Sequence, residues 1–174
     1  MSIAPTSHIT PDNDVVTLEI FIAAPRERIF QAITDPAQTS QWWGQKGLYR
    51  VTKSHADLRQ GGTWYTTGVG ADGTEFTVSG TYLEVDPPHL LVHTWNPSYS
   101  GLHETTVRWE LAAQDVHGLH GQSPHRMGTG TLVRIRHSGF AGKIDACKSH
   151  GEGWVRVLGW MQQFVEEGKT VETR

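Results

Sequence analysis

The 174-residue sequence has one cysteine, Cys147, and no long hydrophobic run. A single cysteine excludes an intrachain disulfide and is typical of the reducing cytoplasm. The apolar stretches fall well short of the roughly 20 residues that cross a bilayer as a helix, so no membrane span is predicted. Residues 1–14 lack the basic-then-apolar order of a signal peptide. We therefore expect a cytoplasmic protein in which residues 1–14 form a flexible N-terminal arm.

The sequence also lacks a strong excess of charge of either sign. It has 15 Lys and Arg residues against 18 Asp and Glu residues, a formal net charge of −3, which argues against an electrostatic nucleic-acid surface. Its two Gly-x-Gly segments, at 68–70 and 128–130, do not stand between a strand and a helix as a dinucleotide fingerprint does. No nucleic-acid partner, membrane partner or cofactor is therefore predicted.

Tryptophan, by contrast, is abundant, with seven residues. The indole ring buries a large apolar area but keeps an N–H group that needs a hydrogen-bond acceptor, so tryptophan clusters often line cavities and interfaces.

The end of the chain predicts one long amphipathic helix over residues 144–165. Small and apolar side chains recur there in steps of three and four, which is the helical period. They are Cys147, Gly151, Trp154, Leu158, Met161 and Val165.

The chain before this helix predicts strands, interrupted early by two short helices. Residues 15–22 alternate as a strand does. One helix is expected over residues 25–33, and a second runs from Asp35, its expected N-cap, to Trp42 or Trp43. Six further strands are expected between turn signals. Their ranges are 50–57, 62–69, 75–85, 90–95, 104–112 and 130–137, with a long polar loop over 113–128.

These elements predict one α+β domain over residues 15–168, followed by a tail at 169–174. The hairpin connections favour an antiparallel sheet of six to seven strands, and its twist and bend should wrap it around the long final helix. Where side chains do not fill the space between helix and sheet, an internal cavity results.

Strand alternation identifies the side chains expected to face that cavity. Trp42 and Trp43 should stand at its mouth, one buried and the other at the rim. The predicted ligand-binding residues are Trp42, Trp43, Trp64, Tyr82, His93, Trp95, Trp109, Ile135, His137, Trp154 and Leu158. The alternative is that these aromatic side chains simply fill the core, with His93 and His137 bonded to neighbouring polar groups.

Other polar groups are weaker candidates for chemistry. Asp57 and Arg59 have the spacing of a local ion pair. His117, His120 and His125 share one glycine-rich loop whose spacing belongs to no rigid element, so we expect adventitious nickel or zinc there and no physiological metal site. Cys147 lies on the apolar helix stripe and should be a buried, unreactive thiol, as is usual for a cysteine in apolar surroundings. No catalytic residue is assigned.

Eight segments in order resemble one known superfamily. They are 24–30 (APRERIF), 34–36 (TDP), 42–44 (WWG), 57–64 (DLRQGGTW), 80–88 (GTYLEVDPP), 90–95 (LLVHTW), 130–131 with 137–140 (GT…HSGF) and 150–154 (HGEGW). The chain resembles the helix-grip fold of START-like proteins, polyketide cyclases and birch-pollen allergens. Within this superfamily it is similar to the family named after the C-terminal domain of the activator of the heat-shock-protein-ninety ATPase.

The resemblance implies a domain that binds a small apolar or aromatic molecule between sheet and helix. A protein-interaction module, as in the chaperone-activating relative, is the first alternative. A cyclase- or hydrolase-type enzyme that uses His93 or His137 as a general base is the second. We expect ligand contact rather than catalysis from both histidines, because no inward carboxylate presents itself to orient them. The sequence leaves a homodimer open.

Overall fold

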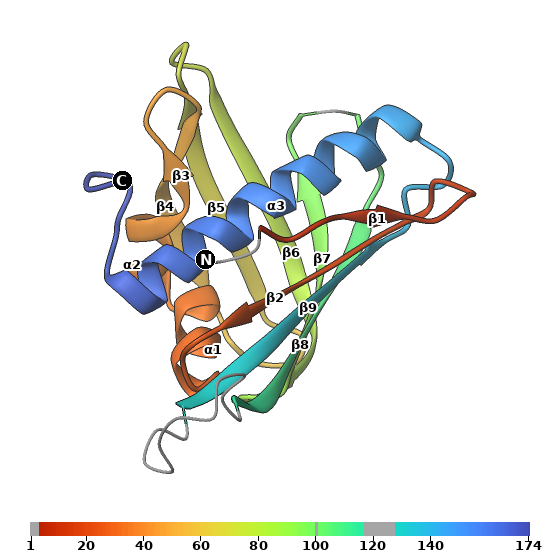
Figure 1. Ribbon diagram of the computed structural model, residues 1–174. Helices are drawn as coiled ribbons and strands as arrows, with labels where there is room; N and C mark the ends of the chain where they lie inside the picture. Colours follow the sequence, from red (N-terminus) through yellow and green to blue (C-terminus); the bar gives the residue numbers. More distant parts are fainter. Residues whose placement is uncertain (1–3, 100, 117–127) are drawn as a thin grey trace.

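One curved antiparallel sheet and a long helix make up the molecule (Figure 1). The computed structural model describes residues 4–99, 101–116 and 128–174. The helices are α1 (Arg26–Thr34), α2 (Pro36–Trp42) and α3 (Ile144–Glu167). The strands are β1 (His8–Ile9), β2 (Val15–Ile22), β3 (Gly44–Gln45), β4 (Tyr49–Ala56), β5 (Thr63–Gly70), β6 (Glu75–Asp86), β7 (Leu90–Pro97), β8 (Thr105–Val116) and β9 (Gly128–Ser138).

The strand order is β1-β2-β9-β8-β7-β6-β5-β4-β3, and every neighbouring pair is antiparallel. Strands β4 to β9 follow one another as hairpins. The first long strand, β2, then pairs with the last, β9, and this closes one side of the sheet around α3 (Figure 1). The predicted α+β architecture, with two short helices after the first long strand, is confirmed.

The structure differs from the prediction in strand number and length. The sheet of the described residues has nine strands because two-residue strands, β1 and β3, extend its edges. Strand β8 runs to Val116, well into the predicted loop over 113–128, because it stays paired with β9 along its whole length. The rest of that loop, 117–127, lies outside the described residues, and so do the three histidines considered there as metal ligands.

Local chemistry sets the helix ends. The side chain of Asp35 accepts a hydrogen bond from the Ala37 N–H (3.0 Å), as predicted for an N-cap. Helix α3 ends at Gly168, which has a left-handed backbone with φ of 70°. The Gly168 N–H donates to the Phe164 carbonyl (2.9 Å), and glycine adopts this conformation at no steric cost.

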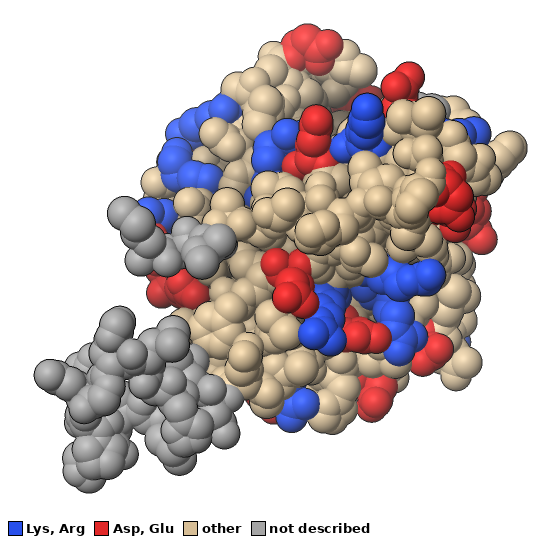
Figure 2. All heavy atoms as spheres, turned by 45° about the vertical axis from the view of Figure 1, so that its right-hand side comes forward, with Lys and Arg blue, Asp and Glu red and all other residues tan. Residues whose placement is uncertain are grey.

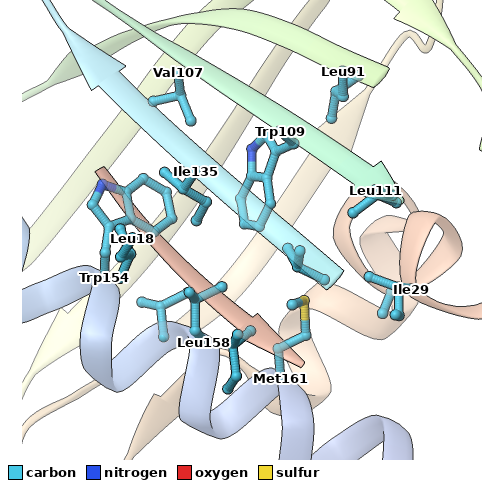
Figure 3. Close-up of a cluster of buried hydrophobic side chains, with 14 of the residues drawn as sticks. Leu18, Ile29, Leu91, Val107, Trp109, Leu111, Ile135, Trp154, Leu158 and Met161 are labelled. Atoms are coloured by element: carbon cyan, nitrogen blue, oxygen red, sulfur yellow. The ribbon is translucent and has the colours of Figure 1, made fainter. Parts of the chain in front are cut away.

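The core lies between α3 and the strands on the β2 side. Trp154, Leu158 and Met161 rise from α3 toward Leu18 and Ile135 of the sheet in Figure 3. These side chains, with Trp109 and Val107, are at most 3% exposed. This is the predicted helix stripe meeting the predicted inward faces of the strands. No helix among the described residues is long and apolar enough to cross a membrane.

Both ends of the described chain, which the sequence assigns to an arm and a tail, have contacts with the domain. Strand β1 pairs with β2. Gly151 of α3 lets the arm pass closely, since a Cβ there would lie 3.1 Å from Ser7 Oγ. Val171 is buried, and its N–H donates to the Gln41 carbonyl (2.9 Å). Backbone pairing holds the first segment, and a buried apolar side chain together with hydrogen bonds from Arg174 to the Trp42 and Trp160 carbonyls holds the second.

Candidate ligand-binding site

Helix α3 packs closely on only one part of the sheet. It contacts β2, β1 and the two short helices. Opposite β4, β5 and β6 it leaves an open cleft of about 570 Å³. Pockets that hold small organic ligands typically have volumes of about 300–1,000 Å³. The cleft therefore has the size of a ligand site.

Aromatic side chains dominate the walls of this cleft. They come from α3, from the sheet and from the segment after α2, and they are Trp43, Tyr49, Phe76, Trp95, Tyr99 and Trp154. Two large apolar side chains of the cleft, Leu48 and Tyr99, are 44% and 45% exposed. Apolar side chains that remain exposed next to one another mark binding surfaces more often than scattered ones do.

Gly153 gives the helical wall of the cleft a flat surface. It lines the cleft, and a Cβ added to it would meet no atom within 4 Å. A side chain at this position would therefore extend into the open cleft rather than into the fold.

A second, smaller space lies deeper between α2 and the sheet. Its volume is about 50 Å³, and it shares Trp43, Thr66 and Trp95 with the cleft, so these residues separate the two. It has room for a few water molecules, whereas a cavity that binds benzene measures on the order of 150 Å³. Two buried polar atoms on its lining residues, Ser54 Oγ and Trp64 Nε1, have no hydrogen-bond partner within the described part of the chain.

The larger space between helix and sheet at this site is an open cleft, whereas the sequence predicts an enclosed internal cavity. The four tryptophans expected to surround a ligand pack against one another, with ring-centre separations of 5.8 Å for Trp64–Trp95, 5.3 Å for Trp95–Trp154 and 5.4 Å for Trp109–Trp154. Interlocked rings leave only the small space described above. The larger space opens to solvent on the other side of Trp43 and Trp95.

Three buried histidines each accept a hydrogen bond from a tryptophan N–H. Trp109 donates to His93 Nε2 (3.0 Å), from the next strand of the sheet. The pairs Trp154–His137 and Trp95–His150 connect the sheet with α3. In these, the indole N–H groups donate to His137 Nδ1 (3.0 Å) and His150 Nε2 (3.3 Å). The pairs satisfy indole donors that burial would otherwise leave unpaired.

The second ring nitrogen of each histidine is also occupied, which fixes the tautomer. The Nδ1–H of His93 donates to the Thr94 carbonyl (3.0 Å), and that of His150 donates to the Ala146 carbonyl (2.8 Å). His137 uses the opposite tautomer, because Nδ1 is its acceptor, and its Nε2–H donates to Thr105 Oγ1 (2.7 Å). All three imidazoles are therefore neutral, with one donor and one acceptor nitrogen each.

Burial keeps these histidines neutral. Loss of hydration lowers the pKa of His93 to about 4, against a weaker opposing effect of its bond to the Thr94 backbone. Burial also lowers the pKa of His137 well below its ordinary value, with the neighbouring His150 and His93 adding to the effect. The pKa of His150 is lowered for the same main reason. The charged form of each ring would lose its tryptophan donor.

This geometry does not suit a general base. The basic nitrogen of His93 or His137 already accepts an indole N–H, so it has no lone pair for a substrate proton. No carboxylate of the described residues is bonded to either ring. The cyclase- or hydrolase-type alternative therefore finds no support in these two residues.

The predicted site residues fall into three groups. Trp43, Trp95 and Trp154 line the open cleft. The small space is lined by Trp64, Tyr82, His93 and Trp109, together with Trp43 and Trp95. Trp42, Ile135, His137 and Leu158 are buried in the core and line neither space. As predicted for the adjacent pair, Trp42 is fully buried while Trp43 is half-buried at the rim.

Sequence reasoning missed several residues of the cleft. His150 stands four positions before Trp154 on the same helix, so helical spacing could have placed it. Tyr49 and Phe76 contact each other across the sheet, with ring centres 5.5 Å apart, although β4 and β6 are not neighbours. No signal in the sequence marks Arg156, which lies at the helical wall.

The weaker candidates are structural. Arg59 Nε lies 2.9 Å from Asp57 Oδ2, and both side chains are exposed, as expected for a local ion pair. Cys147 is fully buried on α3, and burial raises the pKa of its thiol. Within the described chain, no group of three or more His, Cys, Asp or Glu side chains could hold a metal.

The charged surface is mixed in sign. Figure 2 shows basic and acidic side chains beside one another on one face of the molecule. Cross-strand and same-strand ion pairs on the outer side of the sheet include Arg134–Glu19 and Arg108–Glu110.

Comparison with known proteins identifies the family and the fold. The model of the family described as activator of Hsp90 ATPase homolog 1-like protein matches residues 23–118, more than half of the chain. No curated protein sequence matches this chain.

Several solved structures are similar. A protein from Rhodobacter sphaeroides has a TM-score of 0.74 and 17% identity, covering 94% of this chain and 99% of that one. CalU16 from Micromonospora echinospora has a TM-score of 0.61 and 22% identity, covering 95% of this chain and 85% of its own. DynU16, a protein in the dynemicin biosynthetic locus, has a TM-score of 0.67 and 20% identity, covering 91% and 49%. At these identities the likeness shows the helix-grip fold.

Proposed function

The chain belongs to the family of activator of Hsp90 ATPase homolog 1-like proteins, and we propose that it binds a small aromatic molecule in the cleft between α3 and strands β4–β6. One observation carries this proposal. Helix α3 packs on one part of the sheet and leaves, against the other, an aromatic-lined cleft of about 570 Å³.

The chemistry of the lining favours a planar ligand. The ring centres of Trp43 and Trp95 lie 6.1 Å and 5.3 Å from that of Trp154, and Tyr49 and Phe76 also line the cleft. Aromatic rings gain energy from offset stacking and edge-to-face contact beyond what burial alone contributes. The absence of a side chain at Gly153 leaves room for a ring against the helix.

A few polar groups along the cleft would orient such a ligand. Ser98 and Ser149 line it with hydroxyl groups, and Arg156 lines it with a guanidinium. Small-molecule sites typically combine an apolar lining with a small number of placed polar groups. DynU16 is a protein of a biosynthetic locus, and this setting agrees with a small-molecule ligand for a protein of the same fold.

An uncharged fluorescent naphthalene, N-phenyl-1-naphthylamine, tests this function. Its emission should rise on titration with the protein while tryptophan emission falls, with a Kd on the order of 10 µM. The variant Gly153→Leu should weaken binding by roughly tenfold or more, because its side chain fills the cleft. It should not destabilise α3, since leucine has a higher helix propensity than glycine.

Gly159→Leu is the matched control. Gly159 lies on the same helix, a Cβ there also meets no atom within 4 Å, and it does not line the cleft. We expect its affinity for the probe to stay within about twofold of the native value, the ordinary size of a surface effect. Absence of binding to the native chain, or equal loss in both variants, would contradict the proposed cleft site.

A further inference from the structure

One charged side chain on the wall of the cleft has no partner of its own. Arg156 follows Trp154 by two positions on α3, lines the cleft and is exposed. Together with Ser149, Gly153 and Val157 it belongs to the stripe of the helix that faces β4–β6. Its guanidinium therefore lies at the edge of an aromatic surface.

Four arginines of the described chain are ion-paired, and Arg156 is not among them. Arg50, Arg59, Arg108 and Arg134 each lie within ion-pair distance of a carboxylate. No carboxylate among the described residues lies within 4 Å of Arg156. This includes Glu152, one helical turn before it, and Glu75, which also lines the cleft.

The hydroxyl group of Tyr49 lies close enough to Arg156 to feel its positive charge. Burial raises the pKa of Tyr49, while a hydrogen bond from Trp43 and the positive charge of Arg156 act in the opposite direction. Burial dominates, so the phenol keeps its proton at neutral pH. A neutral phenol can donate a hydrogen bond, and Tyr49 lines the cleft. The site thus offers a cation and a neutral donor near one another.

The chemistry of these two groups selects an anion. A guanidinium is weakly hydrated, is always charged and presents planar N–H groups that match a carboxylate or sulfonate. Close to apolar walls its attraction for an anion is stronger than in bulk water. An uncharged aromatic ligand would use the rings but leave Arg156 unpaired.

We propose that the natural ligand is an aromatic anion, whose rings lie among Trp43, Trp95 and Trp154 and whose acidic group accepts hydrogen bonds from Arg156. This inference rests on the proposed function, because it names the chemical class of the molecule bound in the same cleft. The acidic group is a carboxylate, a sulfonate or a similar oxyanion. Arg156 determines specificity, and the aromatic rings supply most of the affinity.

Two probes that share one ring system separate the two proposals. N-phenyl-1-naphthylamine is uncharged, and 8-anilinonaphthalene-1-sulfonate adds a sulfonate to the same rings. The native chain should bind both. Arg156→Gln should weaken sulfonate binding by about tenfold, the lower end for a charged hydrogen bond, and leave uncharged binding within about twofold. Added salt should weaken sulfonate binding to the native chain more than to Arg156→Gln.

Two further variants control for position and charge. Lys148→Gln removes a positive charge from an exposed side chain of the same helix that does not line the cleft, and should leave both affinities unchanged. Glu75→Gln removes the negative charge at the cleft and should not weaken sulfonate binding.

The outcomes are distinguishable. If Arg156→Gln weakens both probes equally, or neither, the aromatic anion is excluded while the cleft still binds aromatic molecules. If the native chain binds neither probe, the proposed function fails and this inference fails with it.

Discussion

The two sides of helix α3 differ in what their tryptophans do. Toward β2, β9 and β8, the rings of Trp109 and Trp154 interlock and their N–H groups are used by histidines. Toward β4–β6, Trp43 is half-buried and its face borders a cleft. The same residue type thus provides packing on one side and an accessible surface on the other. The difference comes from how closely the helix approaches the sheet.

The buried histidines serve as hydrogen-bond partners of the packed tryptophans. An indole that packs in the interior needs an acceptor, and a neutral imidazole supplies one and takes a second bond from the backbone or from Thr105. On this side histidine therefore stabilises the fold. Catalysis or ligand contact would require a free ring nitrogen, and both nitrogens of each of these rings are occupied.

The largest expected effect is on the free energy of unfolding when an aromatic side chain on either side of α3 is truncated to alanine. Trp109→Ala should reduce the free energy of unfolding by about 3–5 kcal/mol, because the ring is 2% exposed and its removal leaves a cavity and an unpaired His93. Tyr99→Ala, on the open side, should change it by about 0.5 kcal/mol or less and instead weaken probe binding. Urea denaturation of both variants measures this. Equal costs would mean that the two sides are packed alike.

Low pH should destabilise the fold through the buried histidines on the packed side of α3. Between its ordinary pKa of 6.5 and its folded pKa of about 4, His93 takes up a proton only in the unfolded chain. The unfolded state then binds more protons, so stability is fully present above about pH 6.5 and falls as the pH drops toward 4. The loss for this one group is about 3 kcal/mol. His137 and His150 act in the same direction.

Denaturant unfolding at pH values between 7.5 and 4.5 measures this loss. His93→Gln should flatten the pH dependence, because it removes the group that takes up a proton only on unfolding. A native chain whose stability is constant from pH 7 to 4.5 would show that these rings are not held neutral.

The smallest expected effect comes from two substitutions of His137, which separate the contribution of its shape from that of its hydrogen bonds. His137→Leu should cost about 1–3 kcal/mol, because it leaves the Trp154 N–H without a buried acceptor and removes the hydrogen bond that Thr105 Oγ1 accepts. His137→Gln should cost less, because an amide offers both an acceptor and a donor. Thermal unfolding of the two variants at pH 7.5 compares them. A glutamine variant that is no better than leucine would indicate that ring packing alone matters.

Much of the fold could be predicted from the sequence because strand and helix periods are local. The alternation of residues 90–95 and 104–112 correctly placed His93 and Trp109 on the inner face. The two-residue strands β1 and β3 are too short to show any period. Val171 carries no pattern either, and it is buried only because the chain turns back onto α2 after Gly168.

The cleft could not be predicted in the same way. Its existence depends on the distance between α3 and β4–β6, and no single element encodes that distance. The sequence indicates that aromatic rings gather between sheet and helix and that one of Trp42 and Trp43 lies at a rim. It does not indicate that Trp109 packs against Trp154, or which of the adjacent pair faces the open space. A single exposed arginine such as Arg156 cannot be assigned to a site from the sequence, and only its position near Tyr49 and the aromatic walls indicates a role in binding.

The indole N–H signals in a two-dimensional ¹⁵N–¹H NMR spectrum test the central claim most directly. The chain has seven tryptophans, and single Trp→Phe variants would assign their signals. On addition of N-phenyl-1-naphthylamine, the signals of Trp43, Trp95 and Trp154 should shift, because their rings line the cleft. Those of Trp42 and Trp109, buried away from the cleft, should stay in place. Shifts confined to Trp42 and Trp109, or no shift at all, would contradict the account.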